Sequence, residues 1–167
     1  MNWRQFASII CLLAAGLFLP EPTGSQAAKP SNPLIGAWRL VSVEDHRPSN
    51  VLSAPGPNPH GTIIYTATGH MAVQITREPQ SNFSSGYDKA TPEEIRTAYE
   101  GYYAYFGTYD VDFDKRIVTH HLEASLRPME IGENYQRAFE LSGNHLVLIP
   151  IKDGKQQPAR LTWERAK

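Results

Sequence analysis

The chain has 167 residues, and its 16 Lys and Arg residues nearly balance its 17 Asp and Glu residues, so the formal charge is −1. Its basic residues are scattered, which leaves no electrostatic footprint for nucleic acid, and we expect no nucleic-acid partner. The single cysteine, Cys11, lies in an N-terminal apolar run. The rest of the chain therefore has no disulfide, and its stability must come from packing and β pairing.

The first 28 residues have the features of an export signal. Arg4 supplies a positive start, residues 9–19 are apolar, and small residues near Ala28 offer a cleavage site. The apolar run is shorter than the ~20 residues that span a membrane, although an uncleaved anchor is the alternative. We expect residues 29–33 to be a flexible leader. The mature protein should be periplasmic or secreted, with no integral membrane association after cleavage.

Residues 34–167 are long enough for one domain with a real core, but not for two. Residues 34–44 are expected to form the first strand, and the proline-rich residues 45–60 a long loop. A hairpin should follow, with strands at 61–66 and 70–77. A polar loop then leads to the next predicted element.

A short helix is predicted from Thr91 onward. Thr91 is a good N-cap, Pro92 suits the first helical position, and Glu94 completes a capping box. Ile95 and Tyr99 continue as an apolar stripe. Such a stripe either packs on the rest of the domain or lines the mouth of a cavity.

The second half of the chain consists of paired β-rich segments. Residues 106–113 and 116–124 flank a turn, residues 133–141 and 145–151 flank another, and residues 160–165 form the last strand. Closely and evenly spaced strands indicate an all-β antiparallel barrel or sandwich. The count is about eight strands, with the helix between the third and fourth. A barrel of this size can hold one small ligand inside.

Strand alternation predicts which side chains face the interior. With a hairpin turn at 114–115, Tyr109 faces His120, and Val118 and His120 share the inner face. His121 must then point outward. The two adjacent histidines cannot bind one metal ion together, and the other histidines show no ligand spacing, so we expect no metal site.

An arginine falls on the inner face of the other hairpin. Pairing around Gly143 places Tyr135, Arg137 and Phe139 on one face. A buried guanidinium is costly unless it is paired and hydrogen-bonded. Its partner could be a protein carboxylate, a ligand carboxylate or tyrosine hydroxyls. The polar residues could therefore form a ligand site, or an internal network that only fixes the strand register.

Several segments in order resemble a known family. The first strand carries Gly36-Ala37-Trp38, similar to the Gly-x-Trp signature of lipocalins. The fuller pattern comprises residues 34–42, 59–61, 65–71, 104–109, 118–121, 137–141 and 161–165. Together these segments look like the lipocalin-like domain family, and the resemblance covers nearly all of the mature chain. It implies a lipocalin-like, calycin-type barrel, but a fold does not specify a function.

The resemblance also implies a structural role for both ends of the domain. In lipocalins a tryptophan of the first strand stacks beneath an arginine of the last strand and closes the barrel floor. Gly36, Trp38 and Arg165 are the matching residues here, and Arg160 is a possible substitute for Arg165. The helix departs from a true lipocalin, in which it follows the last strand.

Our main hypothesis is an exported barrel that binds a small, mainly apolar molecule, which could carry a carboxylate, and uses no cofactor. The expected ligand-binding residues are Tyr65, Met71, Tyr105, Tyr109, His120, Arg137 and Phe139. One alternative is an isomerase, cyclase or hydratase on the same scaffold, using His120, Tyr109 and Arg137. Another is an envelope interaction protein with a filled interior.

Overall fold

Antiparallel strands account for most of the ordered chain. The computed structural model describes residues 32–45, 60–76 and 80–167, all of which belong to one unit, Asn32–Lys167. The expected export signal, most of the leader and most of the first loop lie outside the described residues. The strands are β1 (Gly36–Glu44), β2 (His60–Tyr65), β3 (His70–Thr76), β4 (Tyr102–Asp112), β5 (Ile117–Ser125), β6 (Asn134–Ser142), β7 (His145–Lys152), β8 (Lys155–Gln156) and β9 (Arg160–Arg165).

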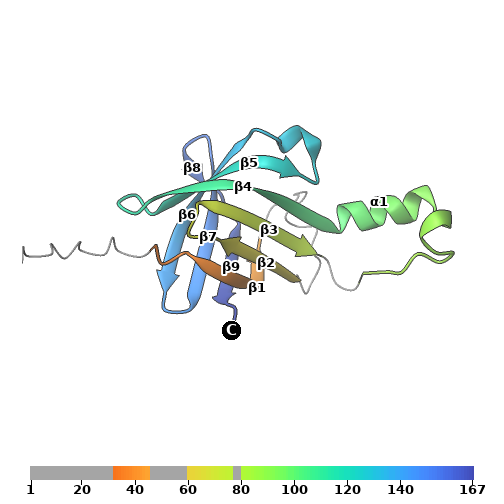
Figure 1. Ribbon diagram of the computed structural model, residues 1–167, viewed down its shortest axis with the longest axis horizontal. Coiled ribbons are helices and arrows are strands. Elements are labelled where there is room, and N and C mark those ends of the chain that lie inside the picture. Colours follow the sequence, from red (N-terminus) through yellow and green to blue (C-terminus); the bar gives the residue numbers. More distant parts are fainter. Residues whose placement is uncertain (1–31, 46–59, 77–79) are drawn as a thin grey trace, which may run out of the picture. The chain divides into compact units, whose positions relative to one another are not determined.

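Eight of these strands close into an antiparallel barrel, as predicted. The order of neighbours is β6-β5-β4-β3-β2-β1-β9-β7, and β6 also pairs with β7, which completes the ring. The two-residue β8 pairs only with the end of β7. Figure 1 shows the strands wrapping around a common interior. Closure removes the exposed strand edges that an open sheet would leave.

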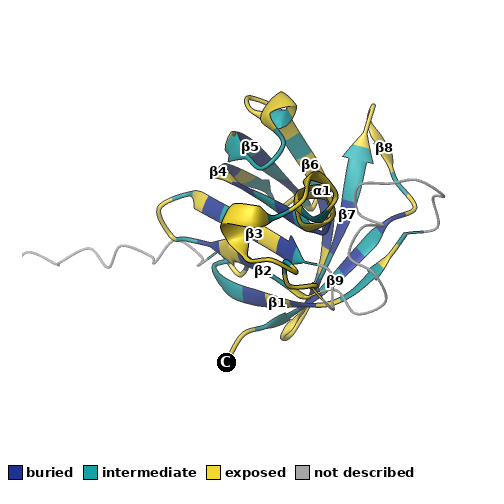
Figure 2. Cartoon of the chain, turned by 90° about the vertical axis from the view of Figure 1, so that its right-hand side faces the viewer, coloured by how far each residue is buried: buried dark blue, intermediate teal, exposed yellow. Residues whose placement is uncertain are grey.

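The predicted register of both hairpins of the second half is confirmed. Tyr109 pairs with His120 across β4 and β5, and Phe139 pairs with Leu148 across β6 and β7. Val118, His120 and Leu122 are buried, whereas His121 lies on the outer side. The alternation of buried and exposed residues along the strands is visible in Figure 2. Turn placement and pleat periodicity were sufficient to assign the two faces here.

The barrel interior is mainly apolar. Its buried side chains come from every strand of the ring and include Leu40, Ile63, Val73, Leu146, Leu148, Leu161 and Trp163. Five tyrosines contribute to the same interior surface, namely Tyr65, Tyr103, Tyr105, Tyr109 and, partly buried, Tyr135. The tyrosines lie on β2, β4 and β6. One side of the interior therefore carries hydroxyl groups, and the opposite wall does not.

Helix α1 (Pro92–Glu100) begins as predicted but does not pack as expected. The Thr91 side chain accepts a hydrogen bond from Glu94 N, and the Glu94 carboxylate accepts one from Thr91 N, which forms the capping box. No residue of α1 is buried: Ile95 is 54% exposed and Tyr99 is 42% exposed. The helix projects beyond the ends of β3 and β4 (Figure 1). Of the two alternatives for its apolar stripe, packing on the barrel is therefore wrong, and lining the mouth of a cavity stays a prediction.

Two short 3-10 helices complete the described secondary structure, at Tyr87–Lys89 and Pro128–Glu130. The first precedes α1, and the second, η2, lies in the connection between β5 and β6. Among the described residues, no helix has the length and apolar character needed to cross a membrane.

The first and last strands meet at one end of the barrel, which we call the floor. Trp38 pairs with Arg165, and the guanidinium carbon of Arg165 lies 4.1 Å from the centroid of the Trp38 ring. This is the contact that the family resemblance implied. Gly36 has a φ of +129°, and a Cβ there would lie 2.8 Å from Nη1 of Arg165. A glycine is therefore needed both for the backbone and for the approach of the arginine.

Candidate functional site

A buried histidine held between two tyrosines is the centre of the candidate site. His120 on β5 is 0% exposed. The hydroxyl of Tyr65 lies 2.8 Å from its Nε2, and the hydroxyl of Tyr105 lies 2.9 Å from its Nδ1. Both ring nitrogens are thus occupied. β2 and β4 supply the tyrosines, so the cluster ties three strands together across the interior.

Burial sets the protonation state of this cluster. Desolvation, followed by the charges of Arg137 and His121, holds the pKa of His120 well below its usual value. Burial likewise raises the pKa of the Tyr65 and Tyr105 phenols. For Tyr105, the nearby charge of Arg137 acts in the opposite direction. At neutral pH the imidazole and both phenols are therefore uncharged.

Tyr109 does not belong to this cluster, although it is the cross-strand neighbour of His120. Its hydroxyl donates to the carbonyl of Thr66 at 2.8 Å and accepts from Nδ2 of Asn32 at 3.1 Å. Only its ring contacts the cluster, edge-on to Tyr65 at 4.8 Å. The predicted trio of Tyr109, His120 and Arg137 was therefore wrong in one member. Pairing places two Cα atoms side by side, but the hydroxyl lies at the far end of a long side chain.

Arg137 lies beside the cluster but is not fully buried. It is partly exposed, and its guanidinium carbon lies 5.3 Å from the centroid of the Tyr135 ring. Its Nη1 donates a long, 3.4 Å hydrogen bond to the carbonyl of Gln136. The expectation of a guanidinium wholly inside the barrel is corrected, because a long arginine side chain on a partly exposed strand can extend to solvent.

Arg137 has no carboxylate partner within residues 32–45, 60–76 and 80–167. Its charge nevertheless acts on three buried groups, lowering the pKa of Tyr65, Tyr105 and His120. Of the partners considered from the sequence, an internal carboxylate is thereby excluded in the described part of the chain. A tyrosine hydroxyl and an external anion remain.

A second polar cluster was missed in the sequence. Glu130 in η2 accepts hydrogen bonds from Tyr103 at 3.0 Å and from Ser125 at 2.8 Å, and lies 3.8 Å from Arg127. The Arg127 guanidinium carbon is also 4.9 Å from the centroid of the Tyr103 ring. This cluster lies where β4 begins and β5 ends, the end of the barrel from which α1 projects. The sequence did contain one signal for it. Tyr103, Tyr105 and Tyr109 all have odd numbers, so in one strand they share a face.

The two clusters are linked by ring contacts. Tyr105 lies between them, with ring centroids 5.5 Å from Tyr103, 5.9 Å from Tyr135 and 5.9 Å from His120. Beyond His120, the Tyr65 ring is 5.6 Å away. These contacts form a column of aromatic rings along one wall of the interior. The column connects the α1 end of the barrel with the Tyr109 end.

The remaining expected ligand contacts lie in the core. Met71 is buried beside the β2–β3 turn and pairs with Tyr65 across the strands. Phe139 is buried, and its ring lies 6.3 Å from that of Phe113. Both face the interior, but no described side-chain hydrogen bond or ring contact joins either of them to the His120 cluster. They are apolar wall residues in this structure.

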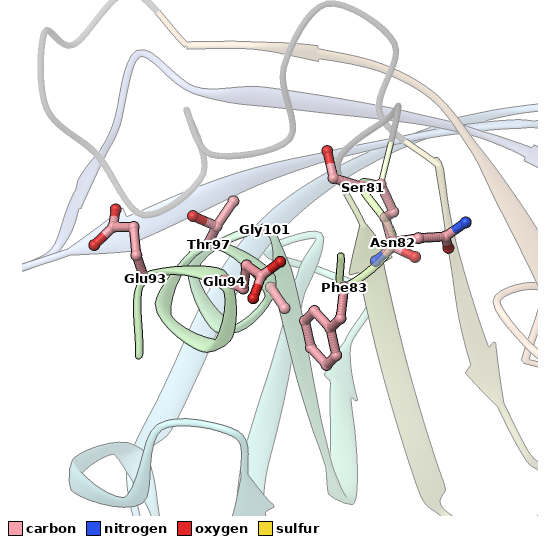
Figure 3. A pocket seen from close by; sticks show the side chains of 9 residues that line it. Ser81, Asn82, Phe83, Glu93, Glu94, Thr97 and Gly101 are labelled. Atoms are coloured by element: carbon pink, nitrogen blue, oxygen red, sulfur yellow. The ribbon is translucent and has the colours of Figure 1, made fainter. Parts of the chain in front are cut away.

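A pocket of about 610 Å³ lies outside this core. It is bounded by residues 80–83 on one side and by α1 and Gly101 on the other (Figure 3). Two glutamates line it, and the hydrogen bonds that Glu94 accepts from Ser84 and Thr91 lower its pKa to about 2. Glu94 thus acts in the cap of α1. Because it is acidic and open, this pocket does not suit an apolar acid.

His121, on the outer side of β5, has a different environment from His120. Its Nδ1 lies close to Oδ1 of Asn134, and its Nε2 lies 2.9 Å from Oδ2 of Asp110. These contacts raise its pKa. The described ranges contain no group of three His, Cys, Asp or Glu side chains arranged to hold a metal ion.

Comparison with known proteins assigns the family. The sequence profile of the lipocalin-like domain matches residues 35–166, nearly the whole described barrel. The chain belongs to the lipocalin-like domain family. No curated protein matches it.

Among solved structures, the chain is similar to the fluorescent protein UnaG. Wild-type UnaG is 13% identical, with 79% of this chain and 96% of UnaG covered and a TM-score of 0.38. Two UnaG point mutants give 13% and 12% identity and a TM-score of 0.37, with 79% and 80% of this chain and 95% and 96% of theirs covered.

Proposed function

We propose that this lipocalin-like protein binds a small, mainly apolar molecule inside its barrel and that Arg137 pairs with a carboxylate of that molecule. Membership of a lipocalin-like barrel family supports small-molecule binding. The apolar wall of the interior would supply affinity through burial, at about 25 cal/mol per Å². The observation that carries the proposal is an arginine beside buried tyrosines with no carboxylate partner among the described residues.

The physical argument concerns the charge of Arg137. A guanidinium cannot lose its proton in a protein, so a partly desolvated one needs compensation. The phenols of Tyr105 and Tyr135 offer it only weak, neutral partners. A carboxylate offers two oxygens in the geometry that a guanidinium fork prefers, and the resulting charge-assisted hydrogen bonds are the strong ones. A ligand acid would therefore gain most from this position.

The experiment compares dodecanoate with its methyl ester, which keeps the carbonyl but removes the charge. Both compete with the neutral dye Nile red for the purified protein. We expect wild type to prefer the acid by about 10-fold or more, since a charged hydrogen bond contributes roughly 1.5–3 kcal/mol. Arg137→Met should abolish the preference.

Arg160→Met is the matched control, because Arg160 makes its 2.7 Å ion pair with Glu140 on the surface. It should retain the preference of wild type. Equal affinity of wild type for acid and ester would refute a role of Arg137 in ligand binding. If neither compound displaced the dye, the alternative of an interaction protein with a filled interior would be favoured.

The enzyme alternative has less support. A general base needs a free ring nitrogen near its substrate and a pKa near the working pH. In His120 both nitrogens contact tyrosine hydroxyls, and its pKa is well below the usual value. Tyr109, the third proposed catalytic group, is bound to backbone and Asn32. No described contact favours catalysis by this trio.

We also propose that the protein acts outside the cytoplasm. Support comes from the charge, apolar run and small residues of the first 28 positions. N-terminal sequencing of the protein from its native host should give a start near Ala28 or Lys29. Soluble cytoplasmic protein that retains Met1 would exclude export.

A further inference from the structure

The cluster around His120 contains more protons than hydrogen bonds. A neutral imidazole carries one N–H, and each phenol carries one O–H. Tyr65, Tyr105 and His120 therefore have three protons, but only two hydrogen bonds join them. Neither hydroxyl has another described acceptor. One phenol proton is left without an acceptor in the interior.

Arg137 determines which proton is left over. Its guanidinium lies over the Tyr135 ring, whose centroid is 5.9 Å from that of Tyr105. After burial, its charge is the largest influence on the Tyr105 phenol, whereas on Tyr65 it ranks behind that of Tyr105. A cation nearer to Tyr105 makes the Tyr105 O–H the stronger donor, which favours donation to Nδ1 of His120. The imidazole proton then lies on Nε2 and is donated to the Tyr65 oxygen. The free proton is that of Tyr65.

Trp163 adds a second free donor to the same interior. It is 1% exposed, and its Nε1 has no hydrogen-bond partner. Across the described residues, no other buried side-chain nitrogen or oxygen lacks one. Tyr109 shows the contrast, because its proton is accepted by the carbonyl of Thr66. Among the described side chains, the interior thus has donors to offer, and every buried side-chain acceptor already has a partner.

We propose that the bound molecule carries an acceptor-only oxygen, such as a ketone or ester carbonyl, which accepts the free proton of Tyr65. This inference rests on the proposed binding function and adds a specificity rule to it. An alcohol of the same skeleton brings its own proton, for which the interior has no acceptor. Burying such a donor unsatisfied should weaken binding by between about 5-fold and 100-fold.

The test uses matched ketones and alcohols without a carboxylate, so that pairing with Arg137 does not determine the measured affinities. Competition with Nile red gives affinities for 2-undecanone and 2-undecanol, and for the pair with oxygen at carbon 6. For at least one pair, wild type should bind the ketone at least about 5-fold more tightly. Tyr65→Phe removes the free O–H and should lower that ratio, although the protons of His120, Tyr105 and Trp163 remain, whereas Tyr109→Phe should keep the wild-type ratio.

The position of the proton can be measured without any substitution. Nitrogen-15 NMR of histidine-labelled wild type distinguishes the two tautomers of His120, which is recognisable because its shifts stay constant when exposed histidines titrate. We expect the Nε2–H tautomer. The Nδ1–H tautomer would place the free proton on Tyr105 and overturn the assignment to Tyr65, even if Tyr65→Phe did not fold.

The outcomes separate this inference from the function on which it rests. Equal affinities for ketone and alcohol in wild type would overturn the inference and leave interior binding intact. A ketone preference in Tyr65→Phe as large as that of wild type would also overturn it. Failure of every ketone, alcohol and acid to displace the dye would overturn the proposed function as well.

Discussion

Two arginines of this barrel lie over aromatic rings, and their surroundings differ. Arg165 lies 4.1 Å from the Trp38 ring centroid and donates to the carbonyls of Ile35 at 2.9 Å and Pro33 at 2.8 Å. Arg137 lies 5.3 Å from the centroid of the Tyr135 ring, and its bond to a backbone carbonyl is 3.4 Å long. The guanidinium of Arg165 thus makes two short hydrogen bonds to carbonyl oxygens, whereas the described hydrogen bond of Arg137 is long.

The difference separates a structural residue from a candidate binding residue. Arg165 joins the first and last strands and holds the chain entering β1 through two carbonyls. Its ring partner is held in turn, since Nε1 of Trp38 donates to the carbonyl of Leu34 at 2.8 Å. In the described part of the chain, the polar groups placed near Arg137 are the phenols of Tyr105 and Tyr135 and the carbonyl of Gln136. A group whose native partners leave it under-satisfied is the better candidate for contact with a ligand.

The largest expected effect is at the floor. Trp38→Ala should lower the free energy of unfolding by about 3–5 kcal/mol, because a fully buried aromatic side chain leaves a cavity. Its loss and that of Arg165→Ala should not be additive, since residues in contact are coupled. Urea unfolding of the two single mutants and the double mutant measures this. Additive losses would show that the stacked contact contributes nothing of its own.

A smaller loss is expected for Arg165→Met. This change removes two charge-assisted hydrogen bonds and the contact with Trp38, at a cost of about 2–3 kcal/mol. The apolar stem is retained, so the packing of the side chain changes little. Chemical denaturation monitored by tryptophan fluorescence provides the value. A loss below about 0.5 kcal/mol would mean that the floor closes without the guanidinium.

The pH dependence of stability should report on Arg137. Below a pH of about 6.5 the unfolded chain protonates His120 while the folded protein does not, because the native pKa is lowered. Stability is therefore complete above that pH and is lost on acidification, by up to about 1.4 kcal/mol per pH unit. Removing the nearby charge in Arg137→Met should raise the pKa of His120, so that the loss of stability ends at a higher pH. Arg165→Met should leave that pH unchanged.

The contribution of His121 to the pH dependence must be removed from that measurement. Asn134 and Asp110 raise its pKa, so its contribution is present at low pH and is lost as the pH rises. The two histidines therefore act in opposite directions. Unfolding is best followed from pH 7 down to the lowest pH at which the protein stays folded, in a His121→Gln background. If the loss of stability ends at the same pH in Arg137→Met as in the background protein, the arginine does not influence His120.

The smallest effect is expected for Arg137→Met in the empty protein. No described carboxylate loses its partner, so the free energy of unfolding should change by less than about 1 kcal/mol, or rise slightly. Thermal unfolding without ligand compares it with wild type. A loss of about 3–5 kcal/mol, the usual result of breaking a buried ion pair, would make Arg137 as structural as Arg165.

The sequence by itself determined the barrel and the faces of its strands. Alternation has a period of two, and the turns at 114–115 and 143–144 fix where pairing starts. The pairing of Tyr109 with His120, the outward direction of His121 and the capping box at Thr91 followed from these local rules. The position of Arg165 beside Trp38 followed from the family resemblance, because closure of a barrel joins its first and last strands.

Only the tertiary structure decided which polar groups meet. Periodicity shows that Tyr65 and Tyr105 face the interior. It does not show how far each side chain extends toward His120. Because the strands of a barrel are tilted, residues of strands that are not paired can lie at the same height along the barrel axis. Strand-pairing rules do not predict that height. The exposure of α1 also depends on where the barrel ends. Sequence pattern thus specifies neighbours along and across strands, whereas contacts through the interior depend on barrel shape.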